Sequence, residues 1–144
     1  MNAEKDETDL ENHFLYAAQR TVPFLDLLGV KPISAHDGRA EFELTVGKSH
    51  LRTLGLLHGG VVASLLDTAM GFAAVTKAPE DFHVVTVQLN VNFVAPSRSG
   101  DTLTAVGEVQ HSGRKTAVAR GEITNQSGAL IGTSTATFMY LPIE

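Results

Sequence analysis

Residues 61–77 form an apolar run of helical length, whereas the segments on either side of it alternate with a period of two. The run follows His58-Gly59-Gly60 and precedes Pro79, so we expect a helix that begins at the glycines and ends before the proline. A helix that is apolar nearly all round is a buried helix, so the remaining segments must wrap around it. Its apolar residues are Val61, Val62, Leu65, Leu66, Ala69, Met70, Phe72, Ala73 and Val75.

Two strand-like segments precede this helix and four follow it. Asp37-Gly38 between the first two is a strong hairpin cue. The connections are short, which favours antiparallel pairing of successive strands. We therefore expect an α+β fold, a curved antiparallel sheet of about six strands wrapped around one long central helix. The expected strands are residues 31–36, 39–46, 83–95, 101–112, 115–124 and 129–141.

Two further details of the pattern concern the N-terminal region and the first strand after the long helix. Short helices are expected at residues 13–20 and 22–28, the second ended by Gly29. In the strand at residues 83–95, Val85, Val87 and Leu89 alternate with polar residues, which is typical of a strand with one buried face.

The length of 144 residues and the apolar content of 43% suit one domain with a single core, which we assign to residues 13–144. Residues 1–12 are expected to be a disordered acidic tail, since residues 1–11 hold five carboxylates and one lysine. The longest basic run is Arg114-Lys115, which argues against nucleic-acid binding. The acidic N-terminus is unlike a secretory signal, so we expect a soluble, cytoplasmic protein that does not bind a membrane.

Asp67 is the one carboxylate within the apolar run, and burying it is unfavourable unless a partner neutralises it or a reaction uses it. In a structural role it would accept a hydrogen bond from a hydroxyl such as that of Ser64. The residues one turn away carry no positive charge, and an acid in such surroundings suits a base or a nucleophile working near neutral pH. The sequence leaves both roles open.

The His58-Gly59-Gly60 motif also has two interpretations. The glycines allow a turn and a helix cap. Alternatively, the first amides of the helix lack intrahelical partners and lie at the positive end of its dipole. Without side chains at Gly59 and Gly60 these amides can approach a substrate oxygen closely, as an oxyanion hole requires.

The helical rise limits how these two features could cooperate. Gly59 and Asp67 are eight residues apart, so at about 1.5 Å per residue they lie roughly 12 Å apart in one chain. Groups that attack and polarise one carbonyl must each come within about 3 Å of it. If the two act together, Gly59 of one subunit must meet Asp67 of another, most simply in a two-fold dimer with two equivalent sites.

A helix opened by His58-Gly59-Gly60, with Asp67 nine residues after the histidine, closely resembles that of the hotdog-fold acyl-CoA thioesterases of the PaaI-like group. The resemblance covers about residues 24–141, and its motif runs from His58 to Ala69. It implies hydrolysis of an acyl-CoA thioester, aliphatic or aromatic, to a free acid and CoA. Asp67 would be the nucleophile or the general base, and the Gly59 amide would polarise the carbonyl. The resemblance also implies homodimers, often paired into tetramers.

The resemblance assigns roles to further residues. It implies that His58 orients the thioester or supports the loop, and that Thr86 positions water. Many relatives have Asn or Gln where this chain has Arg52, which donates hydrogen bonds to a carbonyl or a phosphate but accepts none. We count Arg52, Gly60 and Ser64 as substrate-binding residues.

The substrate that the resemblance implies has a charged CoA end and an apolar acyl end, which require different binding residues. The phosphates of CoA need basic contacts, for which Arg98, Arg114 and Lys115 near the predicted turns are the candidates. The acyl group needs an apolar tunnel. Candidates to line it are Phe24, Leu28, Leu54, Leu57, Met70 and Phe82.

We expect no metal and no organic cofactor, because the chain has no cysteine and its six histidines lack the spacing of zinc ligands. Coenzyme A enters only as part of the substrate. Two other functions are considered. One is a hotdog hydratase or dehydratase acting on acyl thioesters, for which His58 and Asp67 are a poor local match. The other is a non-catalytic acyl-CoA-binding module.

Overall fold

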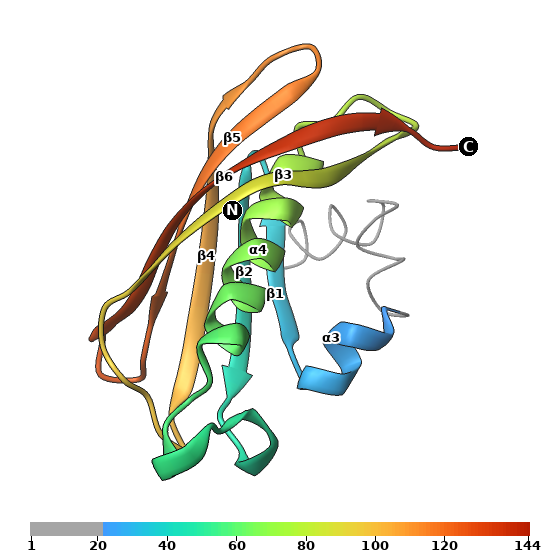
Figure 1. The fold of residues 1–144 in the computed structure, drawn as a ribbon. Helices are drawn as coiled ribbons and strands as arrows, with labels where there is room; N and C mark the ends of the chain where they lie inside the picture. The colour runs from blue at the N-terminus through green and yellow to red at the C-terminus, as the bar shows by residue number, and fades with distance from the viewer. Residues whose placement is uncertain (1–21) are drawn as a thin grey trace.

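A six-stranded antiparallel sheet curves around one long helix in the computed structural model, which describes residues 22–144 (Figure 1). The expected α+β fold is confirmed. The predictions for residues 1–12 and 13–20, and the start of the domain at residue 13, lie outside the described residues. In chain order the elements are α3 (Pro23–Leu28), β1 (Lys31–His36), β2 (Arg39–Thr45), the 3₁₀ helices η1 (Lys48–His50) and η2 (Thr53–Gly55), α4 (Gly59–Val75), β3 (Phe82–Phe93), β4 (Thr102–Ser112), β5 (Thr116–Thr124) and β6 (Leu130–Pro142).

Helix α4 packs into the concave face of the sheet. It begins at the two glycines and ends before Pro79, as the sequence predicts. The closest approach is at Gly107 of β4, where a Cβ atom would lie 2.4 Å from the backbone of Ala69. Any larger residue at Gly107 would push the helix off the sheet. Around this contact the core contains Phe42, Leu44, Leu65, Leu66, Met70, Leu103, Ile123 and Phe138, all fully buried.

One face of α4 is not covered by the sheet. The prediction that the helix is buried on all sides is wrong for this face. Hydropathy misses this because apolar residues such as alanine, glycine and phenylalanine also contribute to the surface of folded proteins. The half-buried residues, at spacings of three and four, are Ala63, Ser64, Asp67, Thr68, Gly71 and Phe72.

The strand order is β1-β2-β4-β5-β6-β3, and every pairing is antiparallel. The expected pairing of successive strands holds for the three hairpins but is wrong for β3 and β4, which are not neighbours. Helix α4 crosses the concave face and carries the chain from β2 to the opposite edge of the sheet (Figure 1). Strand β3 is therefore an edge strand, and it pairs only with β6 among the described residues.

A bulge in β3 changes which side chains face the helix. Thr86 lies opposite Phe138 and Gln88 lies opposite Thr137, so Val87 is an extra residue on this strand. Because of the bulge, Thr86 shares the inner face with Phe138. Strict alternation would instead bury Val85 and Val87 with Leu89, but these two valines are 38% and 56% exposed.

Candidate active site

The centre of the candidate site is Asp67, on the uncovered face of α4. Its side chain is half-buried, and the Thr86 hydroxyl donates a hydrogen bond of 2.7 Å to its Oδ1. The alternative partner considered from the sequence, Ser64, donates instead to the Gly60 carbonyl. The pairing of Asp67 with Thr86 depends on the bulge at Val87, which turns Thr86 toward the helix.

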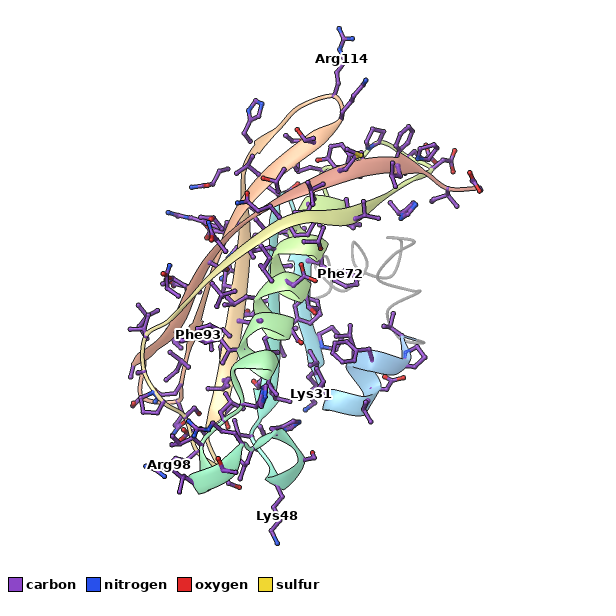
Figure 2. The ribbon with its side chains drawn as sticks, viewed as in Figure 1. Lys31, Lys48, Phe72, Phe93, Arg98 and Arg114 are labelled. Carbon is purple, nitrogen blue, oxygen red and sulfur yellow. The ribbon has the colours of Figure 1, made fainter. Side chains whose placement is uncertain are left out.

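An apolar hollow of about 270 Å³ opens beside this pair. Helix α3 forms part of its wall through Phe24 and Leu25, and Figure 2 shows Phe72 on the side of α4 that faces α3. The polar groups of its lining are Asp67, Thr68 and Thr86. A hollow with this lining accepts an apolar group and presents one end of it to a carboxylate.

The N-terminus of α4 offers hydrogen-bond donors. His58 is the N-cap, and its Nδ1 accepts the Gly60 N–H at 2.8 Å. In the neutral ring the proton then lies on Nε2, which leaves a second donor next to the helix end. The Gly59 N–H has no acceptor among residues 22–144. Gly59 and the Nε2–H of His58 are thus the two open donors, whereas the Gly60 amide is already bonded.

A second hollow, of about 310 Å³, lies at this helix end. Arg52 and Gly59 both line it, so Arg52 shares a hollow with the residue whose amide the sequence singled out. The Phe93 ring forms another wall, and a Cβ atom on Gly59 would lie 3.1 Å from it. A methyl group on Gly59 would shift this exposed ring by only a few tenths of an ångström, whereas a larger side chain would also restrict access to the amide.

The two hollows share no lining residue. Within one chain, Gly59 and Asp67 therefore face different spaces, as the helical rise of about 12 Å over eight residues predicts.

The three basic residues proposed for CoA phosphates do not gather in one chain. Arg98 lies near the N-terminus of α4, bridged to Leu56, whereas Arg114 is at the opposite end of the molecule in the turn between β4 and β5 (Figure 2). Lys115 follows Arg114 in the same turn. No single phosphate group can contact both ends of one chain.

The loop that carries Arg98 is held by Asp101. Its carboxylate accepts hydrogen bonds from the backbone N–H of Arg98 at 3.0 Å, the side-chain amide of Gln126 at 2.9 Å and the Ser97 hydroxyl at 2.7 Å. These donors stabilise the charged form and hold the pKa of Asp101 below its ordinary value, with the Arg98 amide making the largest contribution. This loop also supplies Pro96 and Ser97 to the hollow beside Gly59.

The predicted acyl-tunnel residues separate into groups. Phe24 lines the hollow beside Asp67, and Leu57 lines the one beside Gly59. Met70 is fully buried in the core and lines neither hollow. Leu28, Leu54 and Phe82 line neither hollow.

The sequence interpretation missed several lining residues. Phe138 comes from β6, more than 70 positions after Asp67, and no local pattern connects them. Phe72 is on the same helix as Asp67 and could have been found from its place one turn after Thr68, whereas Leu25 and Phe93 depend on the tertiary fold.

Two further features of the described residues bear on function. Among residues 22–144 no three His, Cys, Asp or Glu side chains come together as potential metal ligands. In the same part of the chain, no helix has both the length and the apolar character needed to cross a membrane.

A curved antiparallel sheet around one long helix is the hotdog fold, which this chain shares with solved structures of thioesterases. The family model of the thioesterase superfamily matches residues 54–131. The acyl-coenzyme A thioesterase PaaI of Escherichia coli K12 is 36% identical over 99 residues, which are 69% of each chain. The chain belongs to the thioesterase superfamily, within its PaaI-like group.

Solved structures agree with this assignment. The PaaI protein of the E. coli phenylacetic acid degradation operon superposes with a TM-score of 0.85 at 27% identity, covering 95% of this chain and 98% of that one. A Streptococcus mutans UA159 protein bound to acetyl CoA gives a TM-score of 0.74 at 27% identity, covering 80% and 90% of the two chains.

Proposed function

We propose that this chain hydrolyses acyl-CoA thioesters to a free acid and CoA. The observation that carries the proposal is the Asp67 carboxylate, held by Thr86 at the edge of an apolar hollow. The hollow fits an acyl group, and the carboxylate beside it can attack the thioester carbonyl or activate water. The name of the E. coli relative and the acetyl CoA in the S. mutans structure support this substrate class.

Each active site in this proposal is shared by two chains. Gly59 and Asp67 line separate hollows, and groups that act on one carbonyl must come within about 3 Å of it. A two-fold axis beside the uncovered face of α4 would bring the start of one helix to the middle of the other. The proposed assembly is a homodimer, which can pair again into a tetramer.

Strand β3 is the proposed edge for this pairing. It has 12 residues, and its extra residue Val87 is 56% exposed. The other edge strand, β1, has six residues and contains Pro32, which cannot donate a ladder hydrogen bond. A long apolar edge is suited to pairing with a second copy, whereas a short edge with proline resists it.

In the proposed reaction the thioester oxygen accepts the Gly59 N–H of one chain, with the Nε2–H of His58 beside it. Asp67 of the other chain either attacks the carbonyl carbon, forming an acyl–aspartyl anhydride that water then hydrolyses, or takes a proton from the water that attacks the carbonyl carbon directly. A C–O bond forms, the C–S bond breaks, and the CoA thiolate leaves and receives a proton. The products are the acid and CoA, and the reaction requires no metal or further cofactor.

CoA is bound, in this proposal, at the Gly59 end of the site. Arg52 and Arg98 lie near this helix end, and Gly60 and Ser64 follow on the same helix. Arg114 and Lys115 can contribute only from another chain, because their turn is at the far end of the molecule. Guanidinium groups pair well with phosphates.

A panel of aliphatic and aromatic acyl-CoAs tests the function. We expect wild-type turnover of part of the panel, and a kcat lowered at least about 100-fold in Asp67→Ala, as for loss of a general base or nucleophile. The control Glu122→Ala removes an exposed carboxylate on β5 and should leave kcat unchanged. Undiminished hydrolysis by Asp67→Ala would contradict the mechanism.

The same panel separates the alternative functions. Hydration of crotonyl-CoA without hydrolysis would indicate a hydratase. Thermal stabilisation by acyl-CoA without turnover would indicate a binding module. For an active enzyme, a single turnover in ¹⁸O-labelled water tests the role of Asp67. Label in the protein shows an anhydride opened at the aspartyl carbon, whereas label in the acid alone is the result of a general base or of an anhydride opened at the acyl carbon.

A further inference from the structure

His50 is the buried histidine of the described part of the chain, with 6% of its surface exposed. Both ring nitrogens are used. Nδ1 accepts the Gly47 N–H at 2.9 Å, and Nε2 lies 2.7 Å from the Leu28 carbonyl oxygen. A carbonyl only accepts, so Nε2 carries the proton and donates, and the ring is held in one tautomer.

The backbone of His50 connects this ring to the start of α4. Its carbonyl accepts the His58 N–H at 2.9 Å. His58 is the N-cap of α4, and the next peptide carries the Gly59 N–H. The peptide between His58 and Gly59 is planar, and His58 is fixed through its own N–H. The direction of the Gly59 N–H therefore depends on the hydrogen bond between His58 and the His50 carbonyl.

The ring connects the same loop to α3. Leu28 is the last residue of α3, and its carbonyl is one of those that a helix end leaves without an intrahelical partner. Helix α3 also supplies Phe24 and Leu25 to the hollow beside Asp67. His50 therefore fixes the loop before α4 to the element that forms a wall of the acyl hollow.

We propose that His50 is a positioning residue for the oxyanion hole. It holds the N-cap of α4 in place by joining it to α3, and so aims the Gly59 amide; this rests on the function proposed above. An apolar side chain could fill the same volume without the cost of burying two polar nitrogens. What an apolar residue cannot do is fix two backbone segments in one geometry through directional hydrogen bonds.

Three variants test the proposal, each assayed on an acyl-CoA that the wild type hydrolyses. His50→Phe fills the site but removes both ring hydrogen bonds. His50→Gln keeps a donor that can reach Leu28. His111→Phe is the control, the same substitution at an exposed histidine in β4. Circular dichroism and thermal unfolding establish which variants are folded at the assay temperature.

We expect kcat to fall at least about tenfold in His50→Phe and about threefold in His50→Gln, with KM changed less than about twofold. His111→Phe should match the wild type. If His50→Phe does not fold, the His50→Gln variant decides alone. A wild-type kcat in any folded His50 variant would overturn the proposal, even if its melting temperature falls. Absence of hydrolysis by the wild type itself would instead contradict the proposed function.

Discussion

At the scale of the residue, the Asp67 carboxylate is stabilised in two ways that its apolar neighbours in the sequence do not reveal. It lies on the half-open face of α4, and the Thr86 hydroxyl donates to it at 2.7 Å. A carboxylate with one oxygen bonded and one face open retains a lone pair for chemistry. The sequence could identify Asp67 from its setting, and Thr86 only through the resemblance, because simple alternation turns Thr86 away from the helix.

Thr86→Val removes the hydroxyl and keeps the shape of the side chain. A hydrogen bond to a charged group contributes about 1.5–3 kcal/mol, so we expect kcat to fall about tenfold or more with KM little changed. Steady-state kinetics on the best substrate of the panel measures this. Thr86→Ser keeps the hydroxyl and should retain most of the activity. An equal fall of kcat in both variants would show that the hydrogen bond from the hydroxyl does not contribute to the rate.

At the scale of the element, most of the fold follows from the sequence. Periodicity and turn residues predict the six strands and α4 to within about two residues, because these signals are local. The edge position of β3, the bulge at Val87 and the open face of α4 depend on how distant segments pair and pack. The hollow beside Asp67 was missed for the same reason, since α3, β3 and β6 supply part of its lining.

The edge of β3 gives a prediction on assembly. Val87→Lys places a charge at the bulge of this edge, and lysine on an edge strand opposes pairing. We expect a shift from dimer to monomer by light scattering, with loss of hydrolysis. Ile33→Lys is the matched control, since Ile33 is 45% exposed at the irregularity of the other edge strand. An active Val87→Lys monomer would contradict a site shared through β3.

The loop held by Asp101 gives a prediction on pH. The folded state lowers the pKa of this carboxyl, so its contribution to stability is present above the unfolded pKa of about 3.9 and is lost as pH falls through the folded pKa. Asp101→Asn should therefore lower the denaturant midpoint at neutral pH, by an amount that shrinks as the pH falls below the unfolded pKa of about 3.9. Glu80→Gln, at an exposed carboxylate, should show no such trend. If the denaturant midpoint of Asp101→Asn is lowered by the same amount at every pH, the lowered pKa of Asp101 is not the source of the stabilisation.

At the scale of the whole molecule, one chain carries the two groups of the proposed active site but keeps them apart. The open amide of Gly59 faces one hollow and the carboxylate of Asp67 faces another. The proposed two-fold pairing would turn these halves into two complete sites and would cover the stripe of α4 that the sheet leaves open. The central claim is therefore that each site takes its amide from one chain and its acid from the other.

Mixed dimers test this claim most directly. Gly59→Pro removes the amide, and the extended backbone of His58, with ψ 134°, is compatible with a following proline. Gly59→Ala is the control, since it adds a Cβ atom and keeps the N–H. Gly59→Pro and Asp67→Asn should each be inactive alone. Unfolded together and refolded at equal concentrations, they should recover about a quarter of wild-type hydrolysis, since half the dimers are mixed and each has one intact site. Mixed dimers as inactive as their parents would contradict the shared site.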